Sequence, residues 1–152
     1  PLSGVIGRGD IMDLPEVGNM SSTHSANPLA CAVGLAVLEE IESRQLIKEA
    51  ERKGGILKTK LNSLKETSGG RISHILGEGL ISAILFQDPD TAQPDSLTAS
   101  MVAEKCYEKG VLVVHTGRES IKLGPTLTIS DDALIEGLDV IIESFGEVVA
   151  LK

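Results

Sequence analysis

The fold is decided by residues 71–86, which read RISHILGEGLISAILF. Two short apolar runs, residues 72–76 and 80–86, lie on either side of a glycine-rich turn at residues 77–79. A break at Ser68-Gly69-Gly70 precedes them and ends the helical periodicity of the preceding segment. Apolar runs bounded by glycine are typical of strands, so this stretch predicts two strands joined by a turn.

Helices and two further strands are expected around this pair. Apolar spacing predicts helices over residues 28–44, 45–66 and 97–109, and a last helix that follows the N-cap residue Ser130. Residues 111–115 and 120–123 read as two more strands with a tight connection. The order of helices and strands predicts an α+β fold, a small antiparallel sheet covered by helices on one face.

The helices differ in how much of their surface is apolar. Helix 45–66 has one apolar stripe, and its lysines at positions 48, 53, 58, 60 and 65 are expected on a solvated face. Helix 28–44 begins apolar nearly all round, so it is expected to pack on several sides against a second domain or subunit. The expected inner stripes are Leu46, Ala50, Gly54, Leu57, Leu61 and Leu64, then Leu97, Met101, Val102 and Cys106, and finally Leu134, Leu138, Ile141, Phe145 and Val148.

Composition narrows the possible functions. The chain has 152 residues and a formal charge of −8, which argues against nucleic acid or an anionic membrane as partner because both require a basic surface. Cys31 and Cys106 stand far apart and read as small buried hydrophobes in a reducing, cytoplasmic compartment. The three histidines lack metal-ligand spacing, so no metal site is expected.

The segment before the first long helix carries the most specific signal. Asn27 is a suitable N-cap and Pro28 suits the first helical position, while Ser22 and Thr23 lie just upstream. The positive end of a helix dipole favours an anion, so these hydroxyls predict a phosphate site. The alternative is an ordinary capped helix after a polar turn.

Several stretches in order along the chain resemble one enzyme family. They are residues 1–8 (PLSGVIGR), 11–13, 22–32 (STHSANPLACA), 77–80 (GEGL), 110–112 and 121–127 (IKLGPTL). Together they resemble the class III aminotransferases, which are fold-type I pyridoxal-phosphate enzymes. The resemblance implies that residues 1–26 are the end of a large cofactor domain, with a buried strand at 2–7, and that residues 27–152 are the C-terminal small domain with its leading helix.

The same resemblance implies roles for individual residues. The threonine matching Thr23 binds the phosphate of pyridoxal 5′-phosphate in the neighbouring subunit of a homodimer, and Ser22 is a weaker companion. The lysine that forms the Schiff base would lie upstream of Pro1. The chain is therefore expected to be a C-terminal fragment that is inactive without its large domain.

Lys122 is the candidate substrate-binding residue. Many family members have arginine at the matching position, where it pairs with a substrate carboxylate, and lysine cannot reproduce that two-pronged geometry. The expected activity is transfer of an amino group from an amine or ω-amino acid to a keto acid. A phospho-lyase of the same family remains open because such members also carry lysine, as do a plain surface role for Lys122 and a non-catalytic α+β binding module.

Overall fold

The computed structural model describes residues 2–115 and 117–151. The chain divides into two compact units, Pro1–Gln45 and Leu46–Lys152. The division leaves the helix that begins at Pro28 in the first unit. The domain boundary implied by the family resemblance, after residue 26, concerns a longer polypeptide and stays a prediction.

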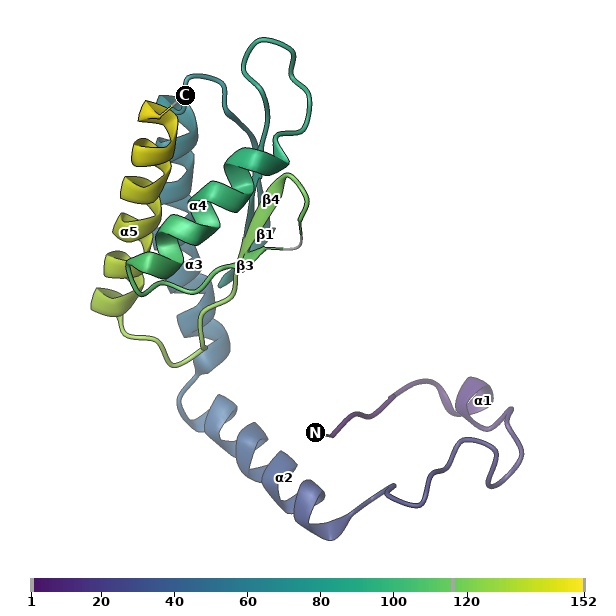
Figure 1. Cartoon of the computed structure of the whole chain (residues 1–152). Coiled ribbons are helices and arrows are strands. Elements are labelled where there is room, and N and C mark those ends of the chain that lie inside the picture. The colour runs from purple at the N-terminus through teal and green to yellow at the C-terminus, as the bar shows by residue number, and fades with distance from the viewer. Residues whose placement is uncertain (1, 116, 152) are drawn as a thin grey trace. The chain divides into compact units, whose positions relative to one another are not determined.

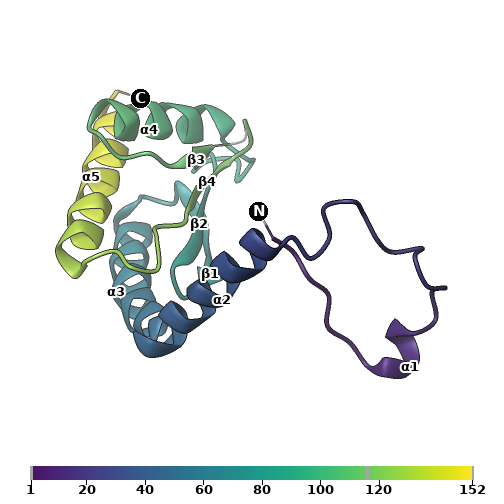
Figure 2. The same ribbon diagram turned by 90° about the horizontal axis from the view of Figure 1, so that it is seen from below.

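The second unit has the predicted α+β architecture. A four-stranded antiparallel sheet has the order β1-β2-β4-β3, and its helices gather on one side of it (Figure 1). Figure 2 shows the same layers from below. The elements are α3 (Leu46–Thr67), β1 (Ile72–Glu78), β2 (Ile81–Phe86), α4 (Ser96–Glu108), β3 (Val114–His115), β4 (Ser120–Leu123) and α5 (Asp131–Ala150).

The core lies between the sheet and these three helices and is almost entirely aliphatic. Ile84 and Ile121 from the central strands and Leu61 from α3 are fully buried. The two phenylalanines of the chain, Phe86 and Phe145, stack with ring centroids 6.0 Å apart. The predicted stripes of α3 and α5 both face this core, which confirms them.

The β1–β2 turn packs directly on α3. Gly79 stands first in the two-residue connection and has a φ of +55°, which glycine adopts without strain. A Cβ atom added to Gly54 on α3 would lie 2.6 Å from the Gly79 carbonyl oxygen. The helix and the turn can approach this closely only because both positions are glycine.

An ion-pair network ties α3 to the start of α5. The guanidinium of Arg52 donates to both carboxylate oxygens of Asp131, at 2.8 and 2.7 Å, and also to Glu49. Hydrogen bonding to Arg52 lowers the pKa of the Asp131 carboxyl and of the Glu49 carboxyl. Ser130 caps α5 as predicted, its Oγ accepting from the Ala133 N–H at 3.2 Å.

Two predicted side-chain orientations were wrong. Lys53 is buried rather than solvated, because its Nζ donates to the Ile129 carbonyl oxygen at 2.5 Å and its stem packs along the core. Leu97 is 62% exposed, and α4 instead buries Thr98, Ala99, Val102 and Cys106. Those four residues are spaced three or four apart, and Leu97 lies off that face.

The third predicted strand is shorter than expected. Only Val114 and His115 pair with β4, whereas residues 111–115 were predicted. The antiparallel register would place residues 111 and 112 opposite Pro125 and Gly124, where β4 has already ended. Proline has no N–H to donate, so the ladder stops there.

The first unit contains α1 (Gly9–Met12), a long loop and α2 (Pro28–Ser43). The predicted strand at residues 2–7 was wrong for this chain, because those described residues are exposed and unpaired and a strand requires a partner. Helix α2 matches the prediction at both ends but has no buried residue. Cys31 on α2 is half-buried rather than buried.

Candidate functional site

The first candidate site is the turn that precedes α2. Ser25 N–H donates to the Ser22 carbonyl at 3.0 Å, and Ser22 N–H donates to the Ser25 hydroxyl at 3.0 Å. The two serine hydroxyls also lie 3.2 Å apart. The hydroxyl of Ser22 is therefore engaged within the turn, which makes Ser22 the weaker candidate for binding an anion.

Thr23 occupies the outer corner of this turn. Its side chain is exposed, and neither its hydroxyl nor its N–H has a hydrogen-bond partner within the described residues. The next residue, His24, is also exposed. Two free donors from one residue are the chemistry that a phosphate oxygen requires.

The start of α2 supports the same turn. Asn27 Oδ1 accepts from the Ala30 N–H at 3.1 Å, and Pro28 occupies the first turn of the helix, as predicted. Ala26 has a φ of +53°, an unusual value for a residue with a side chain. This backbone bend connects the Ser22–Ser25 turn to the helix and fixes the direction in which the chain enters it.

The second candidate site is the face of the sheet opposite the helices. Along β4, Ile121 and Leu123 are buried in the core, so Lys122 between them points to the other face. Lys122 is paired with Ala83 on β2 and with Val114 on β3. Its ammonium forms no ion pair with any described residue.

A shallow hollow of about 330 Å³ surrounds Lys122 on this face. Its other lining residues are mainly apolar, with Leu76, Ile81 and Val114 each more than half exposed. Lys122 is the one charged residue among the described lining residues. The arrangement can bind an anionic group attached to an apolar chain.

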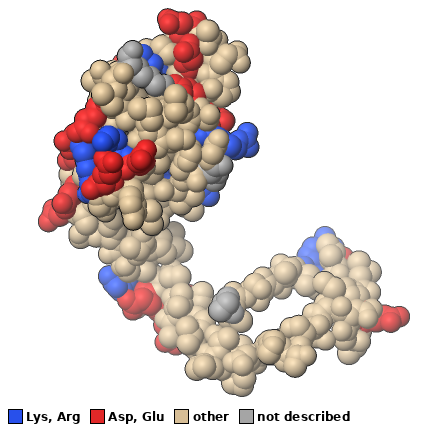
Figure 3. Space-filling view, in the orientation of Figure 1, with Lys and Arg blue, Asp and Glu red and all other residues tan. Residues whose placement is uncertain are grey.

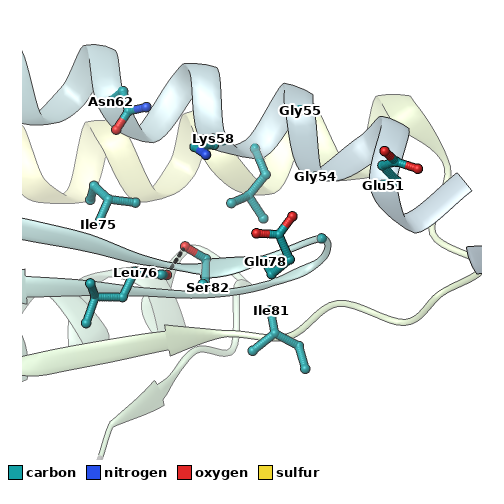
Figure 4. A pocket seen from close by; sticks show the side chains of 13 residues that line it. Glu51, Gly54, Gly55, Lys58, Asn62, Ile75, Leu76, Glu78, Ile81 and Ser82 are labelled. Atoms are coloured by element: carbon teal, nitrogen blue, oxygen red, sulfur yellow. Dashed lines mark hydrogen bonds between the residues drawn. The ribbon is translucent and has the colours of Figure 1, made fainter. Parts of the chain in front are cut away.

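A smaller polar hollow lies between α3 and the β1–β2 hairpin, with a volume of about 180 Å³ (Figure 4). Glu51, Lys58 and Asn62 of α3 and Glu78 of the hairpin contribute its polar side chains. On its floor the Ser82 hydroxyl donates to the Leu76 carbonyl at 2.9 Å. The sequence gave no sign of this hollow, because its two sides are far apart along the chain.

Charges elsewhere on the second unit are paired with one another. Figure 3 shows basic and acidic side chains side by side over the helices. Lys109 at the end of α4 contacts Glu143 and Glu147 of α5, at 3.0 and 2.7 Å. Hydrogen bonding to Glu147 raises the pKa of the Lys109 ammonium. These pairs join helices and leave Lys122 as the cation best placed for an external anion.

Membrane and metal features were also sought in the described residues. Within residues 2–115 and 117–151, none of the helices has the length and apolar character that crossing a bilayer demands. Over the same part of the chain, no three His, Cys, Asp or Glu side chains converge as metal ligands would.

Comparison with known proteins identifies similar sequences and folds. The sequence profile described as Aminotransferase class-III matches residues 1–145. The chain is 35% identical to a 4-aminobutyrate aminotransferase of Mycobacterium leprae over 149 residues, which is 97% of this chain and 33% of that protein. It is also 35% identical to a leucine/methionine racemase of Thermococcus litoralis, covering 97% of this chain and 33% of that enzyme.

The fold comparison agrees with the sequence comparison. The structure of ornithine aminotransferase from Toxoplasma gondii, in which pyridoxal phosphate partly occupies the active site, superimposes with a TM-score of 0.82 at 32% identity. The match covers 95% of this chain and 33% of that one. The chain thus spans about a third of the length of the relatives it matches.

Proposed function

The chain belongs to the class III aminotransferase family, and from this premise we propose that it is the C-terminal part of an enzyme that moves an amino group from an amine or ω-amino acid to a keto acid. The family match over residues 1–145 carries this proposal. Pyridoxal phosphate is the cofactor of the full-length enzymes, and when bound it supplies the electron sink for chemistry at the amino-bearing carbon.

In this proposal Thr23 holds the cofactor phosphate of the neighbouring subunit in a homodimer. Its free N–H and hydroxyl fit that task, since both are exposed and neither has another partner among the described residues. Ser22 keeps the turn in shape through Ser25 and contributes less to the phosphate.

Replacing Thr23 with alanine in the full-length enzyme is expected to weaken cofactor binding about 10- to 100-fold, because a hydrogen bond to a charged oxygen is lost. The dissociation constant is measured by titrating the apoenzyme with pyridoxal phosphate. Thr23→Ser serves as the matched control and should retain most of the affinity, because it keeps the hydroxyl. Equal affinity of the alanine variant and the unchanged enzyme would reject the assignment.

Lys122 binds the anionic end of the substrate in this proposal. The apolar walls of its hollow suit the carbon chain, and the unpaired ammonium suits a carboxylate or phosphate. Lysine acts as a point charge and does not impose the flat, two-pronged contact that arginine makes with a carboxylate.

Lys122→Met in the full-length enzyme is expected to raise KM for an acidic amino donor by about tenfold or more, with a smaller change in kcat. Steady-state kinetics with one ω-amino acid and one uncharged amine provide the comparison. The uncharged amine should show no such rise in KM. A parallel rise for both substrates would mean that Lys122 supports the fold and does not bind the anion.

Elimination of phosphate from a phospho-amine is the second candidate activity, and the presence of lysine at position 122 favours it. The two activities separate when the full-length enzyme is given either an amino donor with a keto acid or a phospho-amine alone. Release of inorganic phosphate without any keto acid supports the lyase, whereas conversion of the keto acid to an amino acid supports the aminotransferase.

The catalytic lysine is placed outside this segment. Residues 1–45, which include the Ser22–Ser25 turn, contain no lysine. The 152-residue chain alone is therefore expected to show no amino-group transfer when supplied with pyridoxal phosphate, an amino donor and a keto acid. Turnover by the isolated chain would overturn this part of the proposal.

A further inference from the structure

One edge of the sheet is apolar and lacks a partner. We call residues 111–114 the β3 edge; they read Val-Leu-Val-Val and end in the first residue of β3. Leu112 is 84% exposed and Val114 is 53% exposed. Leu112 and Val113 make no backbone hydrogen bond to another described residue. A strand edge with free backbone groups and apolar side chains is a template for pairing with another strand.

The opposite edge of the same sheet is built differently. Strand β1 exposes His74 and Glu78, and its ladder is irregular between Ile72 and His74. Charged or polar side chains and irregular pairing are the features by which proteins prevent strand addition. The β3 edge has neither feature, so the two edges are not equivalent.

An apolar hollow lies beside the β3 edge. It has a volume of about 350 Å³ and is bounded by Val111 and Val113 of the edge and by Ala133 and Gly137 of α5. A Cβ atom added to Gly137 would meet no atom within 4 Å, so this part of α5 is uncovered. Side chains of an added strand would find apolar space here next to the existing core.

We propose that a second copy of this chain pairs its own β3 edge with this one, in antiparallel orientation, and joins the two four-stranded sheets into one. With the two-fold axis at Val113, Leu112 of each copy lies opposite Val114 of the other. Both exposed residues of the edge are then covered by apolar partners on the same face, and no like charges face each other. The edge is thus complementary to itself, which favours a second copy over an unrelated strand. This surface is separate from Thr23 and Lys122 and does not depend on the proposed enzymatic activity.

The first test measures self-association of the 152-residue chain by sedimentation velocity over a range of concentrations. A dimer is expected, and Leu112→Lys should raise its dissociation constant at least about tenfold, because a leucine contact is lost and a charge is introduced at each side of the axis. Ile47→Lys is the matched control. Ile47 is 75% exposed on α3, which packs against β1 at the other edge, so this change should leave the dissociation constant unaltered.

The second test determines the register. Leu112→Cys and Val114→Cys chains, each with Cys31→Ser to remove the half-buried thiol, are oxidised separately and as a mixture. Directly opposite residues of an antiparallel pair have Cα atoms about 4.5–5.5 Å apart, within reach of a disulfide. The mixture should therefore cross-link faster than either chain alone.

Three outcomes would overturn the proposal. They are a chain that stays monomeric at high concentration, a dimer whose stability is equally affected by Leu112→Lys and Ile47→Lys, and cross-linking that is no faster in the mixture. The far-ultraviolet circular dichroism of each variant checks that its fold is retained, which is expected because Leu112 and Ile47 are both exposed.

Discussion

Replacing Gly77 with alanine is expected to destabilise the second unit by about 3 kcal/mol or more. Gly77 has a φ of +128°, which residues with a side chain rarely adopt. A Cβ atom at this position would lie 2.1 Å from the Ile81 carbonyl oxygen and 2.7 Å from Ser82 Cα. Both are backbone atoms of the paired strand, so no side-chain rotation can relieve the clash and the hairpin must distort.

Urea unfolding followed by far-ultraviolet circular dichroism measures this effect in a chain without tryptophan. Gly146→Ala on α5 is a matched control, since an added Cβ atom there meets nothing within 4 Å and its φ is not positive. It should leave stability unchanged or raise it by up to about 1 kcal/mol. Similar midpoints for the Gly77 and Gly146 variants would show that the turn tolerates a side chain.

Gly54→Ala and Gly55→Ala are expected to change stability in opposite directions, although the two residues are neighbours on α3. A Cβ atom at Gly54 would lie within 2.7 Å of three backbone atoms of Gly79, so α3 and the hairpin would have to separate. The expected loss is about 2–3 kcal/mol, typical of overpacking at a rigid contact. At Gly55 nothing lies within 4 Å, so alanine should gain about 0.5–1 kcal/mol from its better helix propensity.

The same unfolding experiment compares the two variants, and their difference in free energy of unfolding is the quantity of interest. Both substitutions add one methyl group to the same helix, so intrinsic helix propensity cancels in that difference. Equal effects at the two positions would contradict the close contact between α3 and the β1–β2 turn. The contact also explains physically why the Gly77-Glu78-Gly79 sequence has glycine at both ends.

Much of the second unit could be predicted from local sequence. The stripe of α5, with Leu134, Leu138 and Phe145, faces the core as expected, because helical periodicity directly reports which side is buried. Ser130 and Asn27 cap their helices as predicted, because capping depends on residues three apart. The α+β arrangement followed from the order of the elements.

Features that depend on distant residues could not be predicted. Lys53 is buried because of a carbonyl at Ile129, and Arg52 pairs with Asp131, which is 79 positions away. Strand β3 is short because of where β4 ends, and residues 2–7 find no partner strand in the described chain. Each outcome is set by tertiary contacts that periodicity does not encode.

The candidate sites were predicted to different degrees. Thr23 and Lys122 were selected by family resemblance, and their free polar groups in the structure are compatible with that selection without testing it. The hollow around Lys122 draws Leu76, Ile81 and Val114 from three different strands. Their meeting depends on strand order, which the sequence does not specify.

The absence of any buried residue in α2 has a consequence for biosynthesis. This apolar helix leaves the ribosome before the residues that make up the closed core of the second unit, which take roughly 10 s to synthesise. During that interval its leucine and valine side chains have no finished structure to dock on, and they match the segments that Hsp70-type chaperones bind. Cellular yield of this polypeptide therefore depends on how long such helpers shield the nascent helix, more than on the stability of the folded product.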